Sequence, residues 1–149
     1  MTTLTADDRF AISDLVARFC FASDFGDYDA LDSIFTGNPA TEIEGVGTFD
    51  GLDWQVQHAR DSERWTNGQN RHVITNLWIE PEGDGAVAHY LVINFVAGTK
   101  PGEPRLVTTG RFDDHVVRTP AGWRIARRRF APDQPFVMPE LGANLTPEA

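Results

Sequence analysis

The segment 71–79 carries the residues best suited to proton chemistry. Its sequence, RHVITNLWI, alternates polar and apolar residues, which predicts a strand with two distinct faces. One face combines an imidazole and a carboxamide with two large apolar groups: His72, Ile74, Asn76 and Trp78. The other is typical of a core face: Val73, Thr75, Leu77 and Ile79. A sheet that lines an internal pocket has such a mixture on one side, so we expect His72 at the centre of a pocket.

A second strand, predicted over 86–97, adds polar groups to this pocket. Asn94 shares a face of the strand with Tyr90 and Val92. The Asn94 amide could hold a substrate carbonyl or hydroxyl, although it cannot act as an acid or a base. The Tyr90 phenol could donate a hydrogen bond to a developing enolate. The alternative for Tyr90 is a core tyrosine whose hydroxyl lies at the rim.

The other histidines and the single cysteine bear on metal binding. His58 falls within one turn of Trp54 on a predicted helix, where it is either a cavity residue or a partly exposed helix residue. His89 lies on the strand face opposite to Asn94. Cys20 is the only cysteine, which excludes an internal disulfide and a cysteine-based zinc site. No tight ligand spacing such as HxxxH joins the histidines, so we expect neither a metal nor another cofactor.

The apolar part of the pocket is expected to be largely aromatic. Aromatic residues in helices and strands are core residues first. Those that we expect to reach the cavity and bind the substrate are Phe21, Trp54, Ile74, Val92 and Phe112. They predict a small hydrophobic ligand that is flat, such as a polyketide, a steroid or a terpenoid, and the sequence does not choose among these.

Composition and charge restrict the class of protein. The chain has 149 residues, 41% of them hydrophobic, which suits one globular domain with its own core. The net charge of −9 disfavours binding to nucleic acid or to an anionic membrane surface. The one basic cluster, in 124–129, would place arginines on both faces of a strand, with 22 acidic residues available as partners. No segment approaches the roughly 20 apolar residues that span a bilayer, and no secretory signal is visible. We therefore expect a cytoplasmic protein.

Three helices are predicted in the first half of the chain. The first covers about 6–24, and Thr5 with Asp8 resembles its capping box. Gly26 supplies its stop. The second is a short helix that begins after Asp27, which caps it.

The segments that follow the second helix alternate between turn and element signals. Gly37-Asn38-Pro39 is predicted to be the turn that ends this helix. Residues 40–49 are predicted to form two short strands around Gly45. Asp53 is expected to cap the third helix, which fades near Ser62.

The second half of the chain consists of long strands joined by tight turns. After the two strands described above, 106–118 and 122–130 complete a four-stranded meander. Sequential strands with tight turns predict an antiparallel sheet, and helices gathered at the start must pack on one of its faces. The predicted class is therefore α+β: a cone-shaped, curved antiparallel sheet wrapped around three N-terminal helices, with an internal pocket. This domain would cover 1–130, and 131–149 would form a proline-containing tail that folds back over the pocket as a lid.

The chain resembles SnoaL-like domains of the nuclear transport factor 2-like superfamily. The similarity is carried by residues 21–31 (FASDFGDYDAL), by RHVITN in mid-chain and by 110–114 (GRFDD) followed by 122–125 (GWRI). It extends over about 6–130 and implies a cone-shaped α+β barrel. The superfamily contains dehydratases, isomerases, cyclases, epoxide hydrolases and plain binding proteins, so the resemblance specifies fold more sharply than function.

The resemblance also assigns a partner to His72. Asp24 alone would be an ordinary surface residue at a helix C-terminus, where the helix dipole disfavours a carboxylate. In scytalone dehydratase-like and bile-acid dehydratase-like members, an Asp at the matching place faces the pocket and pairs with a histidine that matches His72. Such a carboxylate would fix the tautomer of the imidazole and stabilise its protonated form. This chain departs from the pattern in two places: phenylalanines and a serine replace the tyrosines near Asp24, and Asn94 stands where an acid is expected.

These observations lead to three hypotheses. The first is a cofactor-independent acid–base enzyme, a dehydratase, isomerase or cyclase, with His72 and Asp24 as its catalytic dyad. The second is a non-catalytic module that binds a small molecule or supports assembly, and the third is epoxide hydrolysis. An apolar outer sheet face suggests a homo-oligomer, most simply a dimer. It would be formed by Val73, Leu77, Val87, Leu91 and Ile93.

Overall fold

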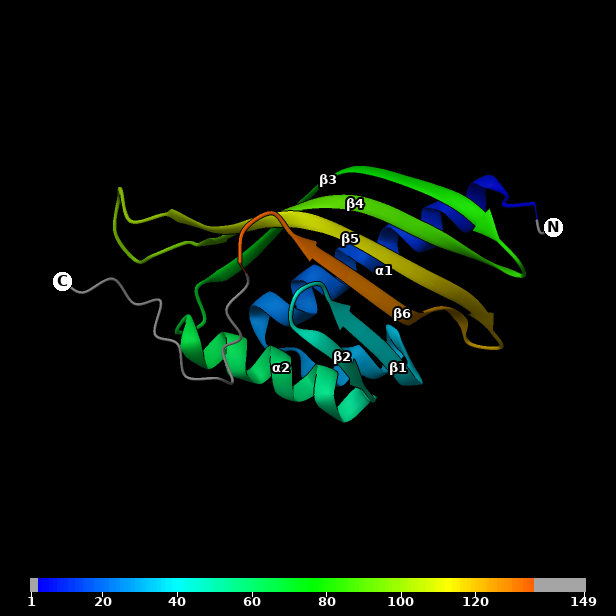
Figure 1. The fold of residues 1–149 in the computed structure, drawn as a ribbon, viewed down its shortest axis with the longest axis horizontal. Coiled ribbons are helices and arrows are strands. Elements are labelled where there is room, and N and C mark those ends of the chain that lie inside the picture. The colour runs from blue at the N-terminus through cyan, green and yellow to red at the C-terminus, as the bar shows by residue number, and fades with distance from the viewer. Residues whose placement is uncertain (1–2, 136–149) are drawn as a thin grey trace.

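The computed structural model describes residues 3–135 and shows helices packed on one curved, open sheet (Figure 1). The helical elements are α1 (Ala6–Phe25), the 3-10 helix η1 (Tyr28–Ser33) and α2 (Leu52–Trp65). The strands are β1 (Phe35–Ile43), β2 (Gly47–Asp50), β3 (Asn70–Glu82), β4 (Gly85–Val96), β5 (Arg105–Thr119) and β6 (Gly122–Pro132). The predicted α+β class is confirmed.

The six strands form one sheet in the order β2-β1-β6-β5-β4-β3. β3 to β6 form the predicted antiparallel meander. β1 pairs with β6 in parallel, so the sheet is mixed and not wholly antiparallel as predicted. Figure 1 shows α1 crossing behind the long strands and α2 lying beside the β1–β2 hairpin. Within residues 3–135, no helix combines the length and the apolarity that crossing a bilayer requires.

Helix α1 begins and ends as its sequence predicts. The Thr5 hydroxyl accepts the backbone N–H of Asp8 at 3.1 Å, and the Asp8 carboxylate accepts that of Thr5 at 2.9 Å. Gly26 ends the helix in the left-handed region with φ 72° and donates its N–H to Ala22. The buried stripe between these caps ends at Asp24, which therefore faces inward.

The second and third helices differ from their predictions at their ends. Gly37-Asn38-Pro39 is not a turn but part of β1, at an irregularity in the pairing of β1 with β6. Proline fits there because a bulge needs no N–H donor at that position. α2 is capped by Gly51 and not by Asp53, which lies in its first turn, and it continues to Trp65 rather than fading near Ser62.

A β-bulge in β3 exchanges the two faces of the strand. Asn76 adopts φ 57°, and the pairing of β3 with β4 shifts between Thr75 and Trp78. Asparagine tolerates this left-handed conformation better than most residues do, and one extra residue turns every later side chain to the other face. Trp78 is consequently 55% exposed, while Leu77 packs against the core. The predicted core face is therefore right for Leu77 and Ile79 but wrong for Val73 and Thr75, which are exposed, and Trp78 leaves the predicted pocket face.

The apolar residues on the outer face of the sheet differ from those predicted. Val73, Leu91 and Ile93 are exposed there. Leu77 is directed to the core by the bulge, and Val87 is buried. The same bulge turns Trp78 to this face beside His89, so the outer face stays partly apolar with a different set of residues.

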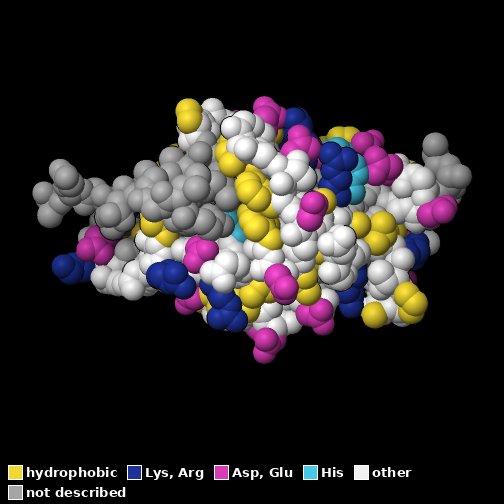
Figure 2. Space-filling view, turned by 60° about the horizontal axis from the view of Figure 1, so that its bottom comes forward, with side chains coloured by type: hydrophobic (Ala, Val, Ile, Leu, Met, Phe, Trp, Pro, Cys, Tyr) yellow, Lys and Arg dark blue, Asp and Glu magenta, His cyan; other side chains and the backbone are white. Residues whose placement is uncertain are grey.

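Acidic and basic side chains are mixed over the face shown in Figure 2. Three of the four arginines of β6 have carboxylate partners, as the number of acidic residues suggested. Arg127 lies 2.9 Å from Glu42, and Arg129 forms an ion pair with Glu44. Most of the basic cluster therefore forms ion pairs in the folded chain, while Arg124 donates to the backbone carbonyl of Trp123.

Candidate functional site

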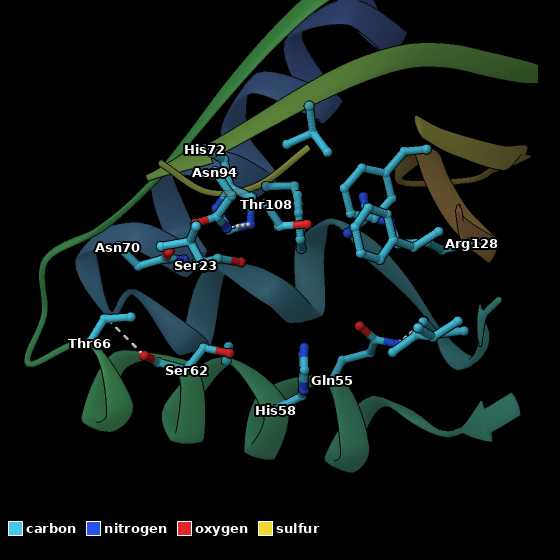
Figure 3. A pocket seen from close by; sticks show the side chains of 18 of the residues that line it. Ser23, Gln55, His58, Ser62, Thr66, Asn70, His72, Asn94, Thr108 and Arg128 are labelled. Atoms are coloured by element: carbon cyan, nitrogen blue, oxygen red, sulfur yellow. Dashed lines mark hydrogen bonds between the residues drawn. The ribbon is translucent and has the colours of Figure 1, made fainter. Parts of the chain in front are cut away.

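A cavity of about 230 Å³ lies between the sheet and the helices (Figure 3). α1 and strands β3, β4 and β5 form the wall that carries His72, and α2 forms the wall opposite to it. β1 and β6 close one end. The wall combines large aromatic groups with polar side chains that can orient a ligand, as a site for a small molecule requires.

His72 and Asp24 lie in direct contact at this cavity. The Nδ1 atom of His72 is 2.6 Å from Oδ1 of Asp24, and the backbone N–H of His72 donates to Oδ2 at 2.7 Å. The Asn70 amide donates to Oδ1 at 3.5 Å. These donors compensate the burial of a carboxylate that is only 6% exposed and sits at the negative end of α1.

The contact with Asp24 determines which nitrogen of His72 is available to a substrate. A carboxylate accepts hydrogen bonds, so Nδ1 carries the proton of the neutral ring and Nε2 keeps a lone pair. Nε2 lies 3.2 Å from Nδ2 of Asn94, the residue directly opposite on β4. Oδ1 of Asn94 is buried and has no hydrogen-bond partner among the described residues. The reactive side of His72 therefore faces the cavity beside an amide with unused capacity.

The opposite wall is built from α2. The rings of Phe49, Trp54 and His58 form a stack with centroid separations of 4.6 and 4.8 Å and nearly parallel planes. In Figure 3 His58 rises from α2 toward the wall that carries His72. Gln55, one helical turn before Ala59, donates to the Thr41 hydroxyl and ties α2 to β1.

A buried ion pair closes the far end of the cavity. Arg128 is 2% exposed and makes two hydrogen bonds of 2.7 Å to Asp114. The Tyr90 hydroxyl donates to Asp114 at 2.7 Å and accepts from Arg128 at 3.1 Å. The Arg128 guanidinium lies 3.6 Å from the ring centroid of Phe19, and that ring contacts His72 edge-on at 6.0 Å. Arg128 thus fixes a ring that packs against the dyad.

Burial governs the proton affinities of this group. Burial raises the pKa of Tyr90 well above its usual value, and the nearby charge of Asp114 adds to the effect. Burial acts to lower the pKa of Arg128, but the Asp114 carboxylate outweighs it and raises that pKa. Tyr90 therefore remains a neutral donor and Arg128 a permanent cation.

Three of the predicted substrate-binding residues lie away from the cavity wall. Tyr90 is buried, and its hydroxyl is hydrogen-bonded to both Asp114 and Arg128, so it is not available to a substrate. Phe21 is 68% exposed on the outer face of α1, where it stacks on Phe25. Ile74 packs into the core instead of lining the cavity. The remaining predicted residues lie at the wall: Trp54, His58, Val92, Asn94 and Phe112.

Several wall residues were not predicted. Arg128 was considered only as a member of the basic cluster 124–129. It lies opposite Asp114 in the β5–β6 pair, but Arg129 lies opposite Asp113 in the same way, so no sequence signal singled out Arg128. Trp65 was expected only as one of the aromatic residues that could reach the cavity, and it lines the wall with a buried indole N–H that has no partner among the described residues. The other polar groups that were not predicted include small side chains that sequence patterns do not single out: Ser23, Thr41, Ser62, Thr66 and Thr108.

The start of the C-terminal segment also reaches the cavity. Gln134 and Pro135 belong to the wall, and Gln134 exchanges hydrogen bonds with Thr108 and Thr109 of β5. The apolar run 136–138, on which the predicted lid depends, lies outside the described residues. Within residues 3–135, no group of three or more His, Cys, Asp or Glu side chains is arranged to hold a metal ion.

A family model for the SnoaL-like domain matches residues 4–129. The chain belongs to the SnoaL-like domain family. An uncharacterized protein of Mycobacterium tuberculosis (strain ATCC 25618 / H37Rv) is 27% identical over 121 residues, which are 81% of this chain and 82% of that protein. The resemblance inferred from the sequence is thereby confirmed.

Solved structures agree with this SnoaL-like assignment. An NTF2-like protein with a cystatin-like fold from Novosphingobium aromaticivorans superposes with a TM-score of 0.76 at 24% identity, over 91% of this chain and 88% of that chain. A proposed aromatic ring hydroxylase from the same organism reaches 0.71 at 26% identity, over 89% and 94% of the two chains. The family includes dehydratases and isomerases, so membership does not by itself define a reaction.

Proposed function

We propose that this SnoaL-like protein is a cofactor-independent acid–base enzyme that removes a proton next to a carbonyl group of a small hydrophobic molecule. The observation that carries the proposal is the contact of Asp24 with Nδ1 of His72 at the wall of the cavity. The second ring nitrogen, Nε2, lies at the cavity wall, where it can accept an N–H of the Asn94 amide at 3.2 Å until a substrate replaces that contact.

The dyad would work by a division of roles. His72 Nε2 would take the proton from the substrate carbon, as imidazole is suited to do near neutral pH. Asp24 would hold the ring in the correct tautomer and stabilise the imidazolium that forms. Asn94, directly beside Nε2, would rotate its amide to hold the substrate oxygen. Proton return to another carbon would give isomerisation, and loss of a leaving group would give elimination.

The cavity favours a substrate with one or two rings. Its volume of about 230 Å³ lies below the ~300–1,000 Å³ that is usual for drug-sized ligands. Among the expected ligand classes, small polyketide or terpenoid fragments fit this volume better than a four-ring steroid. The aromatic groups on the wall, such as Trp54 and Phe112, suit a flat molecule.

The two alternatives have weaker support. Epoxide hydrolysis by a nucleophilic carboxylate would need an acid at the wall, and the described wall residues include no carboxylate, because Asp24 lies behind His72. A non-catalytic binding module could use the same cavity. It would not require a short carboxylate contact that prepares His72 for proton transfer.

The test is exchange of the α-protons of 2-tetralone, a bicyclic ketone, followed by NMR in deuterated water. We expect the protein to accelerate exchange above the buffer rate, and His72→Ala to lose about 10²–10⁴-fold of that acceleration. His115→Gln is the matched control, since His115 is paired with Glu82 away from the cavity. Exchange at the buffer rate with wild-type protein, or an equal rate in His72→Ala, contradicts the proposal.

A further inference from the structure

The cavity contains a second histidine on the wall opposite to the dyad. Histidine is the side chain that gains and loses a proton near neutral pH, and the described wall has two of them, His72 on β3 and His58 on α2. Arg128 cannot donate a proton at such pH because it remains charged and bound to Asp114. A reaction that both removes and delivers a proton would therefore draw on the two imidazoles.

The surroundings of His58 hold its ring in a defined plane. The imidazole stacks on Trp54 with a centroid separation of 4.8 Å and an interplanar angle of 10°, and Trp54 stacks in turn on Phe49. An aromatic face also accommodates a cation, so the stack suits the protonated ring as well as the neutral one. Figure 3 shows His58 directed from α2 toward the wall of His72 and Asn94. A substrate between the walls would have one imidazole on each side.

Among the described residues that line the cavity, no other side chain suits the role of proton donor. Phenylalanine or serine occupies the positions around Asp24 on α1, namely Phe19, Phe21, Ser23 and Phe25. Tyr90, the tyrosine on the adjacent strand, is committed to Asp114 and Arg128. The donor therefore has to come from another element, and α2 supplies one.

We propose that His58 is the general acid that protonates a departing hydroxyl group, so that the substrate is a β-hydroxy ketone and the reaction is loss of water. This inference rests on the proposed role of His72. His72 Nε2 takes the proton from the carbon next to the carbonyl, and the electron pair of that C–H bond forms the new C=C bond. The C–O bond at the β-carbon breaks, and its oxygen takes the proton from His58 to leave as water. His72 then loses its proton to solvent and His58 regains one.

The experiment compares two leaving groups on related ketones. 4-Hydroxy-4-phenylbutan-2-one must lose hydroxide, which needs a proton, whereas 4-(4-nitrophenoxy)butan-2-one loses nitrophenolate, which is stable as an anion. We expect His58→Gln to reduce elimination of water by about 10²–10⁴-fold and release of nitrophenolate by less than about tenfold. 2-Tetralone exchange needs the base alone, so His58→Gln should slow it less than it slows the elimination of water. His115→Gln should leave all three rates unchanged.

Each failure has a distinct meaning. Equal losses for both leaving groups, or unchanged loss of water in His58→Gln, overturn the role of His58 while His72-dependent exchange stands. Exchange by the wild-type protein without any elimination of water from the hydroxy ketone overturns it as well. Absence of 2-tetralone exchange in the wild-type protein overturns the proposed function, and the role of His58 with it.

Discussion

Replacing Asp114 by Asn should destabilise the protein strongly, because Arg128 would keep its charge in a fully buried place. The pair is bidentate at 2.7 Å, and both side chains are at most 3% exposed. Removing one partner of such a buried pair costs about 3–5 kcal/mol. At ~2–4 °C per kcal/mol for a chain of this size, the melting temperature should fall by about 6–20 °C. Thermal and urea unfolding followed by circular dichroism measure this change.

The control is an exposed ion pair of the same strand. Arg127→Gln removes a pair with Glu42 whose arginine is more than half exposed, and such pairs contribute about 0–1 kcal/mol. Tyr90→Phe should lie between the two, at about 1–3 kcal/mol, because it removes the hydroxyl shared by Asp114 and Arg128. If Asp114→Asn lowers the free energy of unfolding no more than Arg127→Gln does, the strong stabilisation attributed to the buried Asp114–Arg128 pair is refuted.

Tyr90 also predicts a dependence of stability on alkaline pH. Its pKa is raised in the folded state by burial and by Asp114, so its neutral form is favoured there. This contribution is fully present below the unfolded value of about 10 and is lost as pH rises from there toward the folded pKa. The free energy of unfolding of Tyr90→Phe should therefore fall less than that of wild type between pH 9 and 11. Over the same range, Arg127→Gln should follow wild type.

Three further outcomes follow from other parts of the fold. The pKa of Asp8 is lowered by Arg118 and by the Thr5 cap, so Asp8→Asn should be less stable at pH 7, and urea unfolding should show the gap closing as pH falls below about 4. Burial raises the pKa of the Cys20 thiol to about 12, so labelling by a disulfide reagent at pH 8 should be slow and limited by unfolding; rapid labelling of the native protein contradicts this. We propose a homodimer through the outer sheet face, where Ile93 is exposed, and Ile93→Asp should shift light scattering to a monomer; a wild-type monomer at high concentration contradicts it.

Elements specified by local signals could be predicted from the sequence, and features set by distant pairing could not. The cap at Thr5, the Gly26 stop and the four-stranded meander depend on residues a few positions apart. The bulge at Asn76 depends on where β4 pairs with β3, and it reversed the strand faces.

The site shows the same division. Asp24 and His72 are 48 residues apart, and it was the family resemblance, not spacing, that paired them. Arg128 belongs to a strand whose two faces both carry arginine, so only packing against Phe19 and Asp114 distinguishes it. The directions of His58 and Trp65 likewise follow from how α2 packs on the sheet, which no local pattern specifies.

The most direct test of the central claim is a double-mutant cycle on the dyad, with 2-tetralone exchange as the measured rate. His72→Ala should remove the catalysed exchange. Asp24→Asn should lose much of it while still binding the ketone, because the amide occupies the same space but cannot stabilise the charged ring. If the two residues act as one unit, the double variant will be scarcely slower than His72→Ala. Losses that multiply would show that the residues act separately, and full exchange activity in His72→Ala would contradict the dyad altogether.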